Sequence, residues 1–452
     1  MRAPLIHDRG NATIQPGGDL MISVEVVEVR VDANRLQTGM YVCRLDRDWI
    51  GTPFEMQGFL VRTAEDAELM AKYCQHVFID DVRSIYAGRR SRPNYQHLQR
   101  QVRPEAMAKL DRLGFRHMRG PDRPALVAVD YPDAIELAKE LPRAQAAWKN
   151  AKALLTRVIA RAKAGKPVSE EEIELVAEPV VESVVRSPDA ALWLAAIRRF
   201  EPYPTSHPLN CCALVLVFAR FLSFPPEILL SMAKGAILMD IGMWRLNQNY
   251  YIKADSLEEA AKAEIHEHVL RGLEYLRQSE FVDLDAILMI LHHHERFDGN
   301  GYPRAVRGIK VSLMGQMLGI ADTFDALCSK RSYHAEETLN TAQKIVYKGR
   351  DEIWPAEVVE SFFQSMGVYP TGSMVQLSNG QIAAVSGQMP SSRLYPRLIL
   401  LTNPQGVPLT EFEEIESSKL IQGALPVKIV STVARGATHL RLDKVEPKVR
   451  SR

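Results

Sequence analysis

Apolar and polar residues alternate over short runs in the first part of the chain, at VEVVEVRV, MYVCRL, FLVR and HVFID. A period of two is typical of β-strands, and the run AEDAELMAKYC between them has the spacing of a helix. We therefore expect a small α/β module over residues 21–85. The Gly-rich and polar residues 1–20 before it are expected to form a disordered tail.

Two further stretches are rich in basic side chains and carry no clear period. Residues 86–132 include GRRSRPNYQHLQRQVR, and the chain ends on a basic segment over residues 436–452. We interpret the first as a solvated linker and the second as a tail. Contact of the linker with a polyanion is the alternative interpretation.

The period changes to three or four residues from about residue 133 and stays so to residue 366. The run LAKELPRAQAAWKNAKALLTRVIARAKAG stops at Gly165, a residue that commonly follows the last turn of a helix. The next run opens on Ser169 and acidic residues, which favour a helix N-terminus. At least seven more helices are expected, so residues 133–366 are predicted to form a helical domain.

After Gly367 the period returns to two, at SMVQL and IAAVS, with Asn379-Gly380 between them. An Asn-Gly pair between alternating runs is a strong signal for a β-hairpin. Residues 367–435 are therefore expected to form a small β module. The predicted fold is mainly α: a helical metal-site domain with a small N-terminal α/β module and a short C-terminal β-hairpin module.

Composition narrows the classes of function. The formal net charge of +1 gives no global attraction to nucleic acid or to an anionic membrane, so neither is an expected partner. The five cysteines are scattered, as in a reducing cytoplasm. The N-terminus has no signal-peptide pattern, and the apolar stretch from Cys211 to Phe224 is broken by Arg220 and is shorter than the roughly 20 residues of a membrane helix. We expect a cytoplasmic protein.

Side chains of the types that bind metals occur within the predicted helices or at their ends. A lone histidine is more often a structural residue than a ligand. Asp240, inside AILMDIGMW, is different, because a carboxylate in an apolar stretch is costly to bury unless it is paired or bound to a cation. Imidazoles and carboxylates together suit one or two divalent ions such as iron, manganese or zinc. The candidate ligands are His207, Asp240, His268, His293, His294 and Asp322.

The segment AILMILHHHERFDGNGYPRAVRG is the most informative part of the chain. An apolar helix delivers adjacent histidines, which point about 100° apart and can serve two ions. The helix is then expected to break at residues 298–303, where two glycines allow close backbone approach and Pro303 fixes the exit. An aromatic ring on this loop, Tyr302, is a candidate for stacking on a base.

These motifs resemble those of a known family. HHERFDGNGYP is similar to the signature HHE-x-x-DG-x-GYP of the HD-GYP family, and YPTSHPLN, EHVLRG and GIADTFDALCSKRSY resemble its other conserved segments. The resemblance covers about residues 189–351, the expected core of the helical domain. Residues 21–85 resemble the uncharacterised domain that often precedes it.

The resemblance implies a bacterial signalling enzyme that hydrolyses cyclic di-GMP with two or three metal ions. It assigns His207, Asp240 and Asp322 to a first metal site. His268, His293 and His294 complete a second site to which the catalytic Asp240 bridges. Arg331, with Gly301, Tyr302 and Pro303, is implied to bind substrate, and His334 stands where a basic residue often follows. Family members also engage GGDEF-type diguanylate cyclases through the loop at residues 301–303.

The chain departs from the family at the dyad that gives it its name. The family segment LHDIGK reads LMDIGMW, so Met239 replaces a histidine ligand and Met243 a lysine. A thioether is a poor ligand for iron(II) or manganese. A weakened enzyme, a one-metal protein and a non-catalytic cyclic di-GMP receptor or protein-interaction module stay open, as does substitution by His266 or His292. A phosphohydrolase for other nucleotides is disfavoured by the GYP loop.

Overall fold

The computed structural model describes residues 28–37, 40–47, 59–61, 64–80, 128–131, 134–198, 203–246, 259–329, 337–389, 395–421, 426–433, 440, 442–445 and 447. The chain divides into two compact units, Met1–Arg90 and Ser91–Arg452. The expected tail at residues 1–20 and most of the basic linker and basic tail lie outside the described residues. Arg331 and His334 do so as well.

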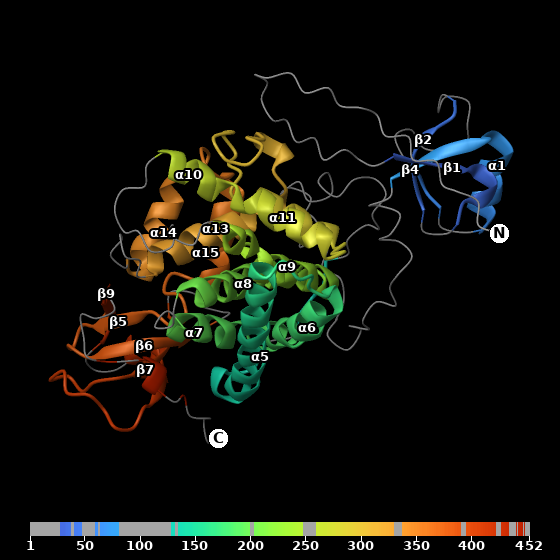
Figure 1. Cartoon of the computed structure of the whole chain (residues 1–452). Helices are drawn as coiled ribbons and strands as arrows, with labels where there is room; N and C mark the ends of the chain where they lie inside the picture. The colour runs from blue at the N-terminus through green and yellow to red at the C-terminus, as the bar shows by residue number, and fades with distance from the viewer. Residues whose placement is uncertain are drawn as a thin grey trace. The chain divides into compact units, whose positions relative to one another are not determined.

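The first unit is the expected mixture of strands and one helix (Figure 1). Its alternating runs form an antiparallel sheet of order β1-β4-β2-β3, and the helical run forms α1. Val42, Met70 and Val77 are buried between sheet and helix. The elements are β1 (Glu28–Asp32), β2 (Tyr41–Leu45), β3 (Phe59–Leu60), α1 (Ala64–Tyr73) and β4 (His76–Asp80).

The second unit is mainly helical, as predicted. The long first helix ends at Lys163, and Gly165 follows with a φ of +65°, the left-handed backbone that glycine adopts without strain. Ser169 caps the next helix, because its side chain accepts a hydrogen bond from the Glu172 N–H. These helices are α5 (Leu137–Lys163), α6 (Glu170–Arg186), α7 (Pro188–Arg198), α8 (Tyr203–Phe221) and α9 (Pro226–Leu238).

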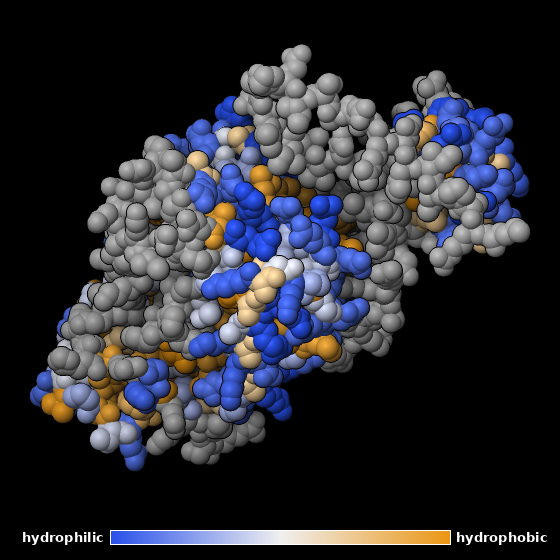
Figure 2. Space-filling model, viewed as in Figure 1, coloured by the Kyte–Doolittle hydropathy of each residue, from blue (hydrophilic) through white to orange (hydrophobic). Residues whose placement is uncertain are grey.

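Shorter helices follow and cover the other side of α8 and α9. Apolar residues surround α8 and α9 on all sides, so these two helices are the centre of the core, where Phe218 packs edge-to-face on Phe362. The face in Figure 2 is mainly hydrophilic, with smaller apolar areas between. The remaining helices are η3 (Ile241–Arg245), α10 (Glu259–His266), α11 (His268–Gln278), α12 (Leu284–His292), η5 (Gly308–Lys310), α13 (Leu313–Cys328), α14 (Leu339–Lys348) and α15 (Ala356–Met366).

The C-terminal β module is larger than a hairpin. The hairpin at Asn379-Gly380 is present, with Met374 paired to Ala384, but it lies within an antiparallel sheet of order β8-β7-β6-β5-β9. The sheet continues beyond the expected hairpin with β7, β8 and β9, and β8 and β9 are too short to show a clear alternation in the sequence. The elements are β5 (Met374–Leu377), β6 (Ile382–Gly387), β7 (Arg397–Leu400), β8 (Glu414–Glu416), α16 (Ser417–Ile421), β9 (Ile429–Thr432) and η6 (Leu442–Lys444).

The sheet shares its core with the helices. Met374, Ala384 and Ile399 belong to the same buried cluster as the helical core, and β6 contacts α7. The sheet also has a small core of its own, which contains Val375 and Leu398. No described helix has the length and apolar composition required to cross a membrane.

Candidate metal centre

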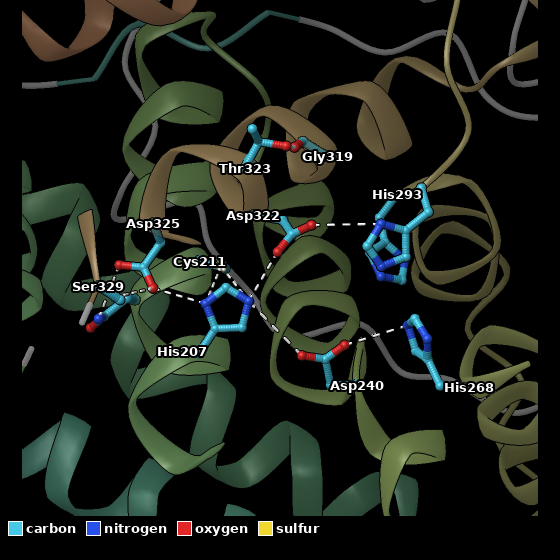
Figure 3. A network of polar contacts seen from close by, with 12 residues as sticks. His207, Cys211, Asp240, His268, His293, Gly319, Asp322, Thr323, Asp325 and Ser329 are labelled. Atoms are coloured by element: carbon cyan, nitrogen blue, oxygen red, sulfur yellow. Dashed lines mark hydrogen bonds and ion pairs between the residues drawn. The ribbon is translucent and has the colours of Figure 1, made fainter. Parts of the chain in front are cut away.

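The six predicted ligands come from five segments of the second unit and meet in one place (Figure 3). His207 lies in α8 and Asp322 in α13, whereas the others stand at helix ends. Asp240 follows α9, His268 is the first residue of α11, and His293 and His294 follow α12. Two groups of ligand atoms result, each within a sphere suited to one cation: Asp240, His268, His293 and His294, and His207, Cys211 and Asp322.

The imidazoles of His268 and His293 are held in the orientation that a metal ligand needs. The Nδ1 atoms of His268 and His293 donate to the carbonyls of Ile265 and Ile290, at 2.8 and 2.6 Å. A carbonyl only accepts, so each ring carries its proton on Nδ1 and keeps a lone pair on Nε2. Both Nε2 atoms are buried and have no hydrogen-bond partner among the described residues. Such orientation of a ring by its other nitrogen is typical of metal-binding histidines.

His207 lies between carboxylates from α13. Its Nε2 is 2.9 Å from Asp322 Oδ1, and its Nδ1 is 2.8 Å from Asp325 Oδ2. Asp325 also accepts from the Asn210 side-chain amide at 3.1 Å and the Ser329 hydroxyl at 3.3 Å. These contacts fix the ring of His207 toward Asp322 and Asp240.

Two carboxylates connect the groups. Asp240 Oδ1 lies 3.5 Å from His268 Nε2, while its Oδ2 lies 3.9 Å from His207 Nε2. Asp322 faces His207 with Oδ1 and has Oδ2 3.7 Å from His294 Nδ1. Asp240 and Asp322 therefore lie between the two groups of candidate ligands, whose imidazole and carboxylate donors fit divalent transition metals.

Burial and charge favour the protonation states that metal ligands require. Burial, together with neighbouring His268, lowers the pKa of His293 to about 4, and burial lowers the pKa of His294 well below its ordinary value. Both imidazoles are therefore neutral at pH 7. Burial opposes ionisation of Asp322, but its hydrogen bond with His207 holds the pKa of the carboxyl well below its usual range.

The loop after α12 is built around Glu295. Its carboxylate accepts hydrogen bonds from the backbone N–H groups of Arg304 and Val306, at 2.7 and 3.0 Å. Gly301 is required by close packing, because a Cβ there would lie 2.3 Å from the Arg296 nitrogen. The loop is thereby held against the helix end that carries the histidines.

Tyr302 was expected to offer an open ring face for stacking on a base, and the structure places it differently. It stacks on His266 at 3.8 Å and on His294 at 4.5 Å, measured between ring centroids. Two parallel imidazoles at these distances cannot share one face of a phenol ring without overlapping, so both faces are covered. In this conformation neither ring face of Tyr302 is available to a ligand.

Neither His266 nor His292 takes the place of the missing histidine. His266 stacks on Tyr302, and His292 Nδ1 accepts from the Ser312 N–H at 3.0 Å. Met239 is fully buried and belongs to the apolar core. Cys211 and Asp325, which contact His207, were not predicted from the sequence. Cys211 lies one helical turn after His207, and Asp325 three residues after Asp322, so helical spacing was the available signal.

The chain is similar to two known families. The chain matches the HD domain family over residues 186–355, which include all six predicted ligands. It also matches a domain of unknown function (DUF3391) over residues 28–173. That match confirms the resemblance of the N-terminal module and extends it to the first residues of α6.

Three bacterial proteins are similar to the chain. A cyclic di-GMP phosphodiesterase of Pseudomonas aeruginosa is 26% identical over 82% of this chain and 84% of its own length. A cyclic di-GMP phosphodiesterase response regulator of Xanthomonas campestris is 31% identical over 29% of this chain and 35% of its own. A 3'3'-cGAMP-specific phosphodiesterase of Vibrio cholerae is 32% identical over 32% of each chain.

The chain spans most of the Pseudomonas relative but only about a third of the other two. The HD domain match over residues 186–355 and these relatives confirm the resemblance of the helical domain to the HD-GYP family.

Proposed function

We propose that the chain is a metal-dependent phosphodiesterase that hydrolyses cyclic di-GMP. The observation that carries the proposal is the pair of ligand groups joined by Asp240, whose two oxygens face His268 and His207. A phosphodiester resists hydrolysis because its negative charge repels a nucleophile. Two divalent ions in such a centre lower the pKa of a water molecule and stabilise the developing charge.

The residues of the chain have distinct parts in this proposal. His268, His293 and His294 would hold one ion with Asp240, and His207 and Asp322 would hold the other. The carbonyls of Ile265 and Ile290 keep two of the rings aligned, so little reorganisation accompanies metal binding. Arg331, which lies outside the described residues, is proposed to contact a phosphate oxygen as a planar, permanently charged fork.

The loop at residues 301–303 is proposed to border the substrate. Gly301 and Pro303 shape the backbone there, and the ring faces of Tyr302 are covered by imidazoles. Docking of GGDEF-type cyclases on this loop stays a prediction. Relatives act on cyclic di-GMP and on 3'3'-cGAMP, so both dinucleotides belong in the assay.

The buried thioether of Met239 favours a second candidate, a receptor that binds cyclic di-GMP without hydrolysing it. Met239 offers no hard donor beside Asp240, and Met243 offers no positive charge for a phosphate. Binding needs one occupied ion site and a phosphate contact, whereas hydrolysis needs the pair of ions.

One experiment separates the candidates. The full chain, loaded with manganese or iron(II), is titrated calorimetrically with cyclic di-GMP while products are analysed in parallel. We expect binding that requires metal, together with turnover to the linear dinucleotide or GMP. His293→Ala should abolish both, whereas His76→Ala, in the first unit, should change neither.

Binding without products, in protein that carries its metal, would replace the enzyme by the receptor. Failure to bind either cyclic dinucleotide, with the protein folded and metallated, would contradict both candidates. A protein-interaction module would then be the better account of the chain.

A further inference from the structure

Cys211 lies beside the least complete part of the metal centre. Its Sγ is 3.9 Å from His207 Nε2 and 3.7 Å from His207 Nδ1. The ligand atoms of Cys211, His207 and Asp322 all lie within 4.8 Å of one another (Figure 3). All three side chains are largely buried, so their donor atoms are withdrawn from bulk water.

The three donors need rearrangement to form a coordination shell. With zinc–sulfur and zinc–nitrogen bonds of about 2.3 and 2.0–2.1 Å, tetrahedral ligand atoms lie roughly 3.3–3.6 Å apart, so His207 Nε2 and Asp322 Oδ1, at 2.9 Å, need to separate only slightly. The Cys211 sulfur is almost equidistant from the two ring nitrogens, so it lies beside the ring and off the line of the Nε2 lone pair along which an ion binds. A rotation about the Cα–Cβ bond of Cys211 is therefore needed to bring its sulfur to the ion.

We propose that the Cys211 thiolate is a ligand of the ion held by His207 and Asp322, and that it completes this site in place of a donor at residue 239. This inference rests on the metal-dependent function proposed above. On binding, the cation displaces the thiol proton to solvent and forms a metal–sulfur bond. Asp240 Oδ2, 3.9 Å from His207 Nε2, is the fourth donor.

A sulfur ligand has a consequence for the choice of metal. Thiolate is a soft donor that favours zinc, whereas carboxylate and water favour manganese and magnesium. The site with Cys211 is therefore expected to select zinc or cobalt(II). The group of three histidines and Asp240 has no sulfur and accepts the harder ions, so the two positions should differ in the metal they prefer.

Cys212 provides a matched control. It is the next residue in α8 and is also fully buried, but it points about 100° away and its Sγ lies 4.0 Å from the Ala233 carbonyl. Cys211→Ser and Cys212→Ser therefore make the same chemical change in the same helix, and only the first removes a sulfur from the centre.

The test is reconstitution of the metal-free full chain with cobalt(II), followed by absorption spectroscopy and metal analysis. We expect two cobalt ions per chain and a near-ultraviolet thiolate-to-cobalt charge-transfer band. Cys211→Ser should lose the band and bind the second equivalent of cobalt about tenfold or more weakly. Cys212→Ser should keep both properties, and thermal unfolding shows whether each variant is folded.

A wild-type chain that binds cobalt with no thiolate band would overturn the inference, as would a band that survives in Cys211→Ser. Hydrolysis of cyclic di-GMP is measured on the same samples. Turnover without the band defeats the Cys211 ligand and leaves the proposed function standing. The band without turnover or dinucleotide binding supports the ligand and defeats the function.

Discussion

At the scale of single residues, the candidate ligands depend on backbone groups that hold their rings. Motifs identify the six candidate ligands in the sequence, but they do not identify the groups that orient them. The carbonyls that orient His268 and His293 belong to whichever residue lies three positions earlier, and any side chain can stand there. Arg331 falls outside the described residues, so its contact with phosphate stays a prediction.

Substitution of Met239 by histidine is expected to increase activity. Met239→His adds a nitrogen donor beside Asp240, and Met243→Lys adds a positive charge. We expect more metal per chain and faster hydrolysis of cyclic di-GMP. Burying an imidazole in apolar surroundings should lower the free energy of unfolding by about 1–3 kcal/mol where no metal is bound.

Metal analysis, turnover and urea unfolding check this prediction. Met232→His is the control, because Met232 is equally buried in α9 but lies two turns before Asp240. It should incur the stability cost without a gain of metal. A double variant with the metal content and turnover of the parent would show that residue 239 does not limit the centre.

Asp325 is expected to act through His207. It accepts from His207 Nδ1 at 2.8 Å and is fully buried. Asp325→Ala should weaken metal binding at the His207 position by about 10–100-fold, as for other carboxylates that orient a ligating histidine. Competition with a coloured chelator measures the loss. Ser329→Ala, which removes only a 3.3 Å hydrogen bond to Asp325, should change metal affinity little. Equal losses in the two variants would argue against orientation by Asp325.

At the scale of elements, periodicity located the helices because most have one apolar face. The same periodicity was weaker in α8 and α9, which are apolar on all sides. It did not indicate β8 and β9, which have three and four residues. The position of α12 depends on a buried ion pair, which the periodicity of the sequence does not reveal. Lys234 of α9 is fully buried and pairs with Asp283, the N-cap of α12, and with Glu170 of α6.

This ion pair is expected to stabilise the helix that delivers the histidines. Lys234→Met leaves Asp283 buried without its partner and should lower the free energy of unfolding by about 3–5 kcal/mol. Lys139→Met, in an exposed pair with Glu136, should cost about 1 kcal/mol or less. Urea unfolding at pH 7 checks both values. The double variant Lys234→Met with Asp283→Asn should recover part of the loss, because the most deeply buried carboxylate is then neutral and only the more exposed Glu170 and Glu174 lose the contact with Lys234.

The pair also predicts a dependence on pH. Burial opposes ionisation of Asp283, but Lys234 and hydrogen bonds outweigh it and lower the pKa of that carboxyl. Its contribution to stability is therefore complete above the pKa of an unfolded aspartate and is lost as the pH falls through the lower folded pKa. In Lys234→Met the folded pKa should instead be raised, so the variant should gain on the parent as the solution is acidified. Parallel losses in acid would contradict this.

At the scale of the whole molecule, the sequence predicted three kinds of module but not which surfaces they share. The alternation in β5 to β7 indicated buried faces, and only the structure identifies the partner: Met374, Ala384 and Ile399 join the helical core. Alternation reveals that a face is covered and contains no information about the covering element. The same limit applies to the ligands, since convergence of five segments is a property of the fold.

A buried polar contact fixes the sheet to the helices. Asp189 of α7 accepts from the Thr371 hydroxyl at 2.7 Å and from the Arg397 guanidinium at 3.3 Å. Burial raises the pKa of Asp189 despite these partners. An ionised Asp189 is therefore held at a cost, which its two partners offset only in part.

Asp189→Ala is expected to loosen the sheet without emptying the metal centre. The change leaves the Thr371 hydroxyl and the Arg397 guanidinium without their acceptor, at a cost of about 1–3 kcal/mol. Because that loss falls at the junction, the segment of residues 367–433 should be cleaved by protease faster than the helices, while bound metal is unchanged. Asp189→Asn keeps an acceptor for Thr371 and should have a smaller effect, and Lys419→Ala, which breaks an exposed pair with Glu416, should have none. Cleavage of the helices and the sheet at the same rate would show that the junction unfolds only together with the whole unit. Asp189 would then contribute to global stability and would not hold the sheet to the helices specifically.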